Sequence, residues 1–202
     1  MLELYTAATP NGRKVTIALE ELEVPYELKP IDLGAEQQLG EEFLARNPNH
    51  KIPVISDDGM VIWESGAILL YLAEKHGALL PADPAGRIHA IQYAFFQTGG
   101  IGPNLGRFGA QVRRPEKERN AEMLQVFGDE VGRLCGVLER ILSDGREYLA
   151  GDYSIGDIMH YPWLHPLVSF GAPMITERKQ VMEWMDRIGA RPAVQRGMQI
   201  PA

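Results

Sequence analysis

The sequence predicts a small mixed α/β domain followed by an all-helical domain, and two observations support this division. Up to about residue 76, short β-like apolar runs alternate with helical patterns, whereas almost only helical periodicity follows. Between the two halves lies the segment 79–86, LLPADPAG, whose two prolines and one glycine are typical of a linker. We therefore expect one domain at 1–78 and a second at 87–202.

The first half predicts strands and helices in the order β-α-β, a short helix, then β-β-α. The expected elements are a strand at 2–5, a turn at 9–12 that leads into a helix ending at Leu22, a strand at 26–31, a short helix at 41–46, strands at 53–56 and 61–62, and a helix at 67–76. Residues 57–59, Asp-Asp-Gly, are a hairpin turn signal. Because a crossover helix requires its two strands to pair in parallel, we expect a small mixed sheet with helices on both faces.

The second half is expected to consist of helices. Helical periodicity indicates helices at 87–98, 116–142 and 175–188, and an apolar run follows Ser154. The glycine-rich residues 99–103 are expected to interrupt or kink the first of these helices. Ser154 and Asp157 have the spacing of a capping box, with Asp in place of the preferred Glu or Gln.

Length, composition and charge exclude several classes of protein. With 202 residues, 45% of them apolar, the chain is long enough to bury a hydrophobic core. The net charge of −7 argues against nucleic acid or an anionic membrane as a general partner. The single cysteine, Cys135, cannot form an internal disulfide, and the apolar runs are shorter than the roughly 18 residues of a membrane span. With no visible signal peptide, we expect a cytoplasmic protein.

The first candidate site is the turn Thr9-Pro10-Asn11-Gly12 between a strand and a helix. A helix N-terminus favours anions and thiolates, because its free N–H groups and its dipole are positive there. The Thr9 hydroxyl and the Asn11 amide are donors that could stabilise a sulfur anion. The alternative is an ordinary capped turn, in which the same residue types are common.

Two further motifs could bind an extended ligand with charged ends. In the segment 51–54, KIPV, a cis bond before Pro53 would turn the backbone of Ile52 outward, where it could pair with a peptide; the alternative is an edge-strand proline. Ser65 is a good N-cap whose hydroxyl and N–H could bind a carboxylate, and Glu64 could pair with an ammonium. The alternative there is a plain helix start with a solvated glutamate. No metal or nucleotide motif is present, so neither ligand is expected.

The order and spacing of these motifs resemble those of a known family. The patterns LYT-x₃-PNG-x-K-V, NPNHKIPVI and WESGAILLYLAEKHG are similar to the thioredoxin-like domain of cytosolic glutathione transferases. The helical remainder, with YLAGDYSIGDI and W-x₂-RI-x-ARPAV, also resembles that family. TPNG and the GGIGPNLG stretch look most like the bacterial nu class of glutathione-dependent disulfide-bond oxidoreductases. The resemblance therefore implies a thioredoxin-like first domain, an all-helical second domain that lines the acceptor site, and a homodimer.

The resemblance also assigns particular residues to glutathione as a cosubstrate. The matched positions are Glu64 and Ser65 at the γ-glutamyl group, Ile52 before a cis Pro53 at the cysteinyl part, Gln38 and Lys51 near the glycyl end, and Thr9 with Asn11 beside the sulfur. In the nu class a basic residue precedes the aromatic residue of the long helix, whereas here Val126 precedes Phe127. The pattern therefore leaves open whether one or two glutathione molecules bind.

The expected activity is reduction of small disulfides by thiolate exchange. No cysteine lies near the first turn, so the reacting sulfurs would all come from bound ligands. Conjugation of glutathione to a small electrophile is an alternative that needs the same thiolate. A non-catalytic binding module on the same fold is a second alternative.

Overall fold

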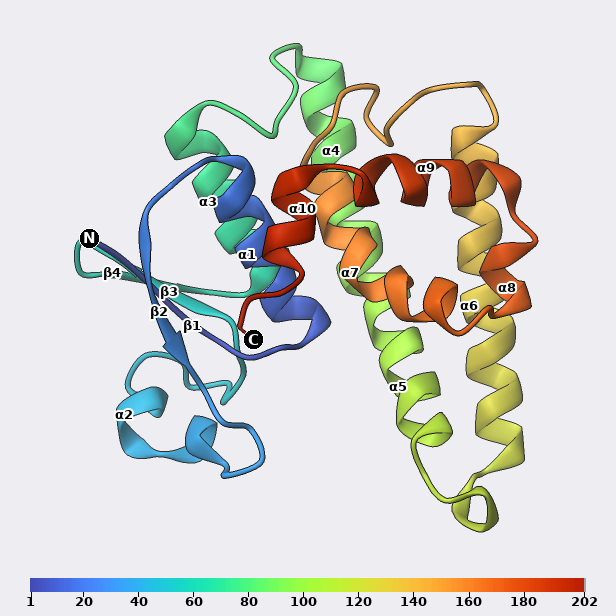
Figure 1. Cartoon of the computed structure of the whole chain (residues 1–202), viewed down its shortest axis with the longest axis horizontal. Coiled ribbons are helices and arrows are strands. Elements are labelled where there is room, and N and C mark those ends of the chain that lie inside the picture. Colours follow the sequence, from blue (N-terminus) through green and yellow to red (C-terminus); the bar gives the residue numbers. More distant parts are fainter. Residues whose placement is uncertain (202) are drawn as a thin grey trace. The chain divides into compact units, whose positions relative to one another are not determined.

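The computed structural model describes residues 1–201, which form two compact units (Figure 1). The first unit contains Met1–Leu80 together with the C-terminal segment from Gly189 onward, and the second contains Pro81–Ile188. No helix among the residues described is both long enough and apolar enough to cross a membrane.

A four-stranded sheet forms the centre of the first unit. Its strands are β1 (Leu2–Thr6), β2 (Tyr26–Pro30), β3 (Val54–Asp57) and β4 (Met60–Trp63), in the spatial order β2-β1-β3-β4. β1 is parallel to β2 and antiparallel to β3, and β3 and β4 form a hairpin, so the predicted mixed sheet is confirmed. The sequence placed the start of β3 at Pro53, but the strand begins one residue later, because proline has no N–H for the ladder.

Helices cover both faces of this sheet. The helices of this unit are α1 (Pro10–Glu21), a 3₁₀ turn (Gln37–Leu39), α2 (Glu41–Leu44), α3 (Ser65–His76) and α10 (Pro192–Gly197), the last of which packs on α1. α1 and α3 pack side by side (Figure 1). On the other face, Phe43 of α2 is buried against Tyr5 and Val54. Because consecutive side chains of a strand alternate, the fully buried Leu4 faces away from Tyr5, toward the α1–α3 layer. Tyr5 is a core residue, as expected.

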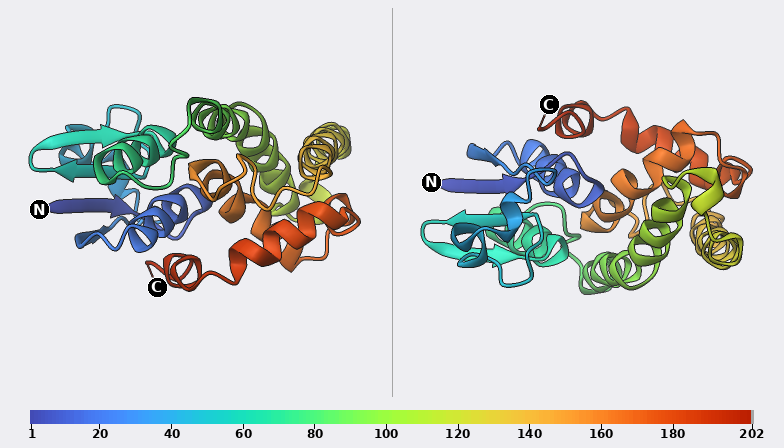
Figure 2. Two further views of the ribbon diagram at one scale, coloured as in Figure 1. Left: turned by 90° about the horizontal axis from the view of Figure 1, so that it is seen from above. Right: turned by 90° about the horizontal axis from the view of Figure 1, so that it is seen from below.

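The C-terminal helix α10 lies against α1 (Figures 1 and 2). The Thr16 hydroxyl donates to the carbonyl oxygen of Gly197 at 2.7 Å, and Arg191 makes two hydrogen bonds to Glu21, at 2.7 and 2.8 Å. The sequence placed the last helix before Arg191, and α10 was missed. Pro192 begins it, since the missing N–H of a proline costs nothing in the first turn of a helix.

Gly197→Ala is expected to lower the free energy of unfolding by about 2 kcal/mol, because the added methyl group has no room. A Cβ at Gly197 would lie 2.6 Å from Cα and 2.7 Å from N of Ile17, and helix backbone cannot rotate away as a side-chain end can. Urea unfolding measures the loss. Gly40→Ala in the same unit is the control, since its Cβ would make an ordinary contact of 3.4 Å; an equal loss there would contradict the steric explanation.

The second unit is built from helices. They are α4 (Pro84–Phe96), a π-helical segment (Gln97–Ile101), α5 (Gly102–Val112), a 3₁₀ turn (Glu116–Glu118), α6 (Ala121–Leu142), α7 (Ile155–Ser169), α8 (Pro173–Thr176) and α9 (Lys179–Gly189). The interruption expected in the glycine-rich segment is this π-helical turn. The helix expected from Ile175 or Thr176 to Ile188 corresponds mainly to α9, and its first residues belong to the separate short helix α8.

Side-chain caps explain why two helices begin elsewhere than the periodicity indicated. α4 begins three residues before position 87, because the Asp83 carboxylate accepts a hydrogen bond from the Gly86 N–H at 2.8 Å. α6 begins at Ala121 rather than at 116, because Asn120 supplies the cap and residues 116–118 form a separate turn. Helical spacing alone does not separate such a turn from the helix that follows it.

The capping box predicted at Ser154 and Asp157 is confirmed, and it extends into a buried network. The Asp157 carboxylate accepts hydrogen bonds from Ser154 N at 2.9 Å, Ser154 Oγ at 3.1 Å, Leu149 N at 3.0 Å and Trp184 Nε1 at 2.8 Å. Burial raises the pKa of this carboxyl to about 6, although the four donors act in the opposite direction. One side chain thus ties α7 to α9 and to the preceding loop.

Candidate functional site

The segment that the sequence predicted as a turn is the first turn of α1. Thr9 is the N-cap, with an extended backbone, and its Oγ1 accepts a hydrogen bond from the Gly12 N–H at 3.2 Å. A hydroxyl oxygen that accepts in this way keeps its own hydrogen to donate. Pro10 and Asn11 occupy the first two helical positions, and Asn11 is half-buried. Two side chains that can donate hydrogen bonds therefore flank the positive end of the helix.

Gly12 fixes how closely this turn approaches the end of β1. A Cβ at Gly12 would lie 2.2 Å from the carbonyl oxygen of Ala7 and 2.4 Å from Oγ1 of Thr6, so no larger residue fits without movement of the backbone. The tight contact holds the first turn of α1 directly on the loop that follows the strand.

The Asn47 side chain supports the loop before β3 through hydrogen bonds to its backbone. The peptide bond between Ile52 and Pro53 is cis, as the resemblance implied. Asn47 is 2% exposed, and its Nδ2 donates to the carbonyl oxygen of Lys51 at 2.6 Å, while its Oδ1 accepts from the Asn49 N–H at 2.9 Å. The sequence predicts only that the short helix 41–46 ends before Asn47, and this does not indicate that the side chain supports a loop.

The start of α3 differs from the expectation. Ser65 is already the first helical residue, and the N-cap is Glu64, with φ 72° and ψ 115°. Such positive φ values are uncommon for a residue with a side chain and cluster at functional sites. No side chain among the described residues caps α3, so the N–H groups of its first turn remain available to a ligand.

The register of the sheet brings these segments together. Tyr5 of β1 pairs with Val54 of β3, and Val54 pairs with Trp63 of β4. The loop after β1, the cis proline before β3 and the start of α3 after β4 therefore all lie at one end of the sheet. Because Thr6 pairs with Pro30, the chain leaves β2 at the same end and continues to Gln38.

Gln38 and Lys51 differ in their surroundings. Gln38 lies in the 3₁₀ turn before α2, and its Oε1 is buried without a hydrogen-bond partner in the described part of the chain. Lys51 is exposed beside the half-buried Ile52. Among the described residues, no hydrogen bond or ion pair joins either side chain to the first turn of α1 or to the start of α3, so their roles stay predictions.

A lysine that the sequence analysis did not assign to the site links α1 to α3. Lys14 is only 2% exposed, and its Nζ donates to the Ser65 hydroxyl oxygen at 3.4 Å. Burial lowers the pKa of this ammonium to about 7, and the negative charge of Glu64 opposes the shift. A signal was present, because Lys14 precedes the buried Ile17 and Ala18 by three and four residues and so shares their helix face.

Two hollows of the surface are lined by residues other than the predicted ones. A cavity of about 460 Å³ in the first unit is lined mainly by residues of α2 and the segment before it, with the Arg46 guanidinium 4.6 Å from the centre of the Tyr5 ring. A second, of about 520 Å³, lies in the second unit beside Asp83 and Arg146. Within residues 1–201, no group of three acidic, histidine or cysteine side chains could hold a metal ion.

The sequence matches known proteins along most of its length. Residues 1–74 match the family described as glutathione S-transferase, N-terminal domain. Over 201 residues the chain is 39% identical to the disulfide-bond oxidoreductase YfcG of Escherichia coli strain K12, and the match covers 96% of this chain and 92% of that protein.

Solved structures are similar as well. A glutathione transferase from Burkholderia graminis, with two glutathione molecules bound per subunit, has a TM-score of 0.92 and 42% identity; the match covers 99% of this chain and 88% of that one. A glutathione transferase from Pseudomonas putida, with one glutathione disulfide bound per subunit, has a TM-score of 0.93 and 40% identity; here the coverage is 100% and 92%. Together with the sequence matches, this agreement shows that the chain belongs to the glutathione S-transferase family.

Proposed function

We propose that this protein binds glutathione at the end of the sheet described above and uses it to reduce small disulfides. The assignment of the ligand follows from its chemistry. Glutathione is an extended peptide with one ammonium, two carboxylates and a thiol. Glu64 and the uncapped start of α3 suit the γ-glutamyl end, the backbone of Ile52 suits the cysteinyl part, and Gln38 and Lys51 suit the glycyl carboxylate. The glutathione-bound relatives support this choice.

The sulfur would then lie at the first turn of α1. A free thiol with a pKa near 8.5 is only about 3% ionised at neutral pH. Lowering that pKa by two units corresponds to about 2.7 kcal/mol, which one or two hydrogen-bond donors and a helix dipole together can supply. Thr9 and Asn11 are the two donors at this position.

The single observation that carries the proposed mechanism is the state of Cys135. It is the only cysteine of the chain, it is fully buried in the second unit, and burial raises the pKa of its thiol to about 11. The protein therefore has no thiolate of its own to form a mixed disulfide, and every reacting sulfur must come from a ligand.

The reaction consumes two glutathione molecules for each disulfide. The first glutathione thiolate attacks one sulfur of the substrate disulfide, so that a mixed disulfide forms and one substrate thiolate leaves. A second glutathione thiolate attacks the glutathione sulfur of the mixed disulfide, which yields glutathione disulfide and releases the second substrate thiolate. The two leaving thiolates take up the two protons that the glutathione thiols lost.

A purified sample is expected to reduce 2-hydroxyethyl disulfide with glutathione, and to form one glutathione disulfide per substrate consumed. Conjugation to 1-chloro-2,4-dinitrobenzene, measured beside it, is expected to have a kcat/KM at least about 10-fold lower, because an electrophile uses the same thiolate but makes no sulfur–sulfur exchange. Cys135→Ala is the control and should retain full activity. Faster conjugation than reduction would favour the transferase alternative, and no turnover with either substrate would favour a binding module.

A further inference from the structure

Lys14 carries a charge that the proposed reaction does not use. Its side chain extends from α1 to the first turn of α3, where Nζ donates to the Ser65 hydroxyl oxygen. Only 2% of the residue is exposed, so the ammonium has lost almost all its contact with water. A buried charge opposes folding unless groups around it compensate.

The surroundings of Lys14 point to an anion at the start of α3. Glu64 is exposed, and its negative charge acts on the Lys14 ammonium. On the elements packed around α1, Lys75 pairs with Asp57, Arg191 with Glu21 and Arg196 with Glu20. Glu74 and His76 lie at the opposite end of α3. The buried ammonium of Lys14 therefore lies next to the first turn of α3, which has no side-chain cap.

We infer that Lys14 is a positioning residue for the γ-glutamyl α-carboxylate of the ligand, an inference that rests on the proposed function. The Ser65 oxygen accepts a hydrogen bond from the ammonium, so the hydroxyl hydrogen must point elsewhere, toward the ligand side. The carboxylate then accepts hydrogen bonds from the O–H and N–H of Ser65, and the positive charge of Lys14, on the other side of the Ser65 hydroxyl, attracts it. Lys14 acts through Ser65 and does not contact the reacting sulfur.

The arrangement couples binding to protonation. With a pKa lowered to about 7, the side chain is a mixture of ammonium and amine near neutral pH. An arriving carboxylate favours the ammonium and raises that pKa, so binding takes up a proton. Affinity is then highest below pH 7, where Lys14 is already charged, and decreases as the pH rises above 7 and the charge is lost.

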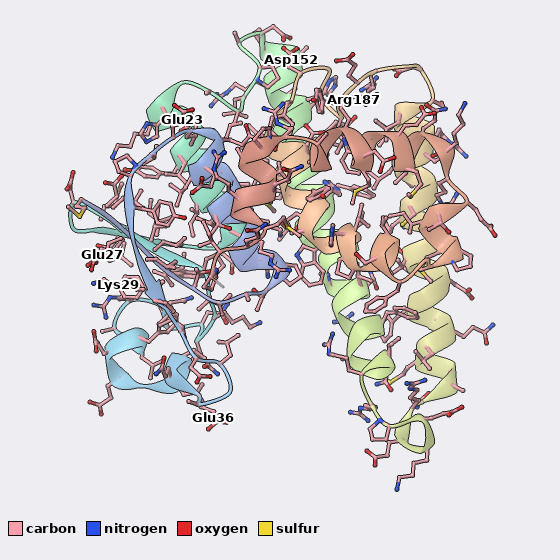
Figure 3. The ribbon with its side chains drawn as sticks, in the orientation of Figure 1. Glu23, Glu27, Lys29, Glu36, Asp152 and Arg187 are labelled. Atoms are coloured by element: carbon pink, nitrogen blue, oxygen red, sulfur yellow. The ribbon has the colours of Figure 1, made fainter. Side chains whose placement is uncertain are left out.

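Calorimetric titration with S-methylglutathione tests this inference, because that probe has no thiol to titrate. In buffers of different ionisation heat at pH 7, the wild type is expected to take up about half a proton per ligand. Lys14→Met should take up none and bind about 10-fold more weakly at pH 6.5. Lys29→Met is the matched control, since Lys29 lies on β2 of the same unit, where it pairs with the neighbouring Glu27 (Figure 3); it should behave like the wild type.

Thermal unfolding separates lost binding from lost structure. Without ligand at pH 7, Lys14→Met is expected to melt at the same temperature as the wild type or higher, because the variant no longer buries a charge. Lys14→Gln is the second variant, used for the same titrations if the methionine variant does not fold. It keeps a donor for Ser65 without a charge, and it is expected to bind with intermediate affinity and without proton uptake.

The outcomes distinguish this inference from the proposed function. If the wild type binds S-methylglutathione and a folded Lys14 variant binds it equally well with the same proton uptake, the role of Lys14 is overturned and the glutathione site stands. If the wild type itself shows no binding at millimolar probe, the proposed function and this inference fail together.

Discussion

Asn11→Ala is expected to lower glutathione-dependent turnover of a small disulfide by about 100-fold, while the fold is retained. Asn11 lies in the first turn of α1, where its amide can donate to the sulfur of bound glutathione. Removing one donor from a preorganised anion site typically costs about 10²- to 10³-fold in rate. The lower figure applies here, because Thr9 and the helix N-terminus still act on the sulfur. The residue is only half-buried, so truncation disturbs little packing.

The thiolate absorbance of bound glutathione gives a readout that a structural defect would not move. Asn11→Ala is expected to raise the pKa of the bound thiol by about one unit, so that half-ionisation occurs at higher pH. Asn11→Asp is the matched variant, because it has the same size but places a negative charge beside the sulfur, and it should raise that pKa further. Unchanged turnover and an unchanged thiol pKa in the alanine variant would remove Asn11 from the mechanism.

Much of the fold follows from local patterns in the sequence. The alternation in 2–5 and the helical spacing up to Leu22 depend on neighbouring residues, so the order of strands and helices in the first unit could be predicted. The capping box at Ser154 and Asp157 is local in the same way. The C-terminal helix was missed because Pro192 can either stop one helix or begin another, and the contact with α1 that decides between them is distant in sequence.

The candidate site, like the fold, could be predicted only as far as local sequence patterns reach. Its segments could be located because glycine, proline and cap residues mark turns locally. Their meeting at one end of the sheet depends on the pairing of Tyr5, Val54 and Trp63, which no local pattern reveals. The helical spacing of Lys14 from Ile17 and Ala18 indicates that it lies on the buried face of its helix, but its contact with Ser65 requires two helices to pack and is not visible in the sequence. Without the resemblance to a family, the roles of these residues would have stayed open.

Asp157→Ala is expected to lower the free energy of unfolding by about 4 kcal/mol, which is at the upper end for a single substitution. The carboxylate accepts four hydrogen bonds, from Ser154 N and Oγ, Leu149 N and Trp184 Nε1, and these groups lie in the core around it. Each buried donor left without an acceptor costs about 1–3 kcal/mol. The gain from no longer burying a carboxylate offsets part of that sum.

The pH dependence has a definite sign. Burial raises the pKa of Asp157 in the folded protein to about 6, above its ordinary value of 3.8, so the folded state binds the proton more tightly than the unfolded state. The stability contributed by this group is full below pH 3.8 and is lost as the pH rises through 6. The difference between the wild type and Asp157→Ala should therefore grow as the pH falls from 7 to 4.

Urea unfolding followed by tryptophan fluorescence measures these differences, since Trp184 donates directly to Asp157. Asp157→Asn should cost about half as much as alanine, because the amide oxygen can still accept from Leu149 and Trp184 while its NH₂ group meets the donors of Ser154. Asp152→Ala is the control, because Asp152 is an exposed carboxylate in the loop before α7 (Figure 3) and its removal should change stability little. A loss in Asp157→Ala no larger than in this control would show that the network does not hold α7 and α9 together, and that the four donors find other acceptors when the carboxylate is removed.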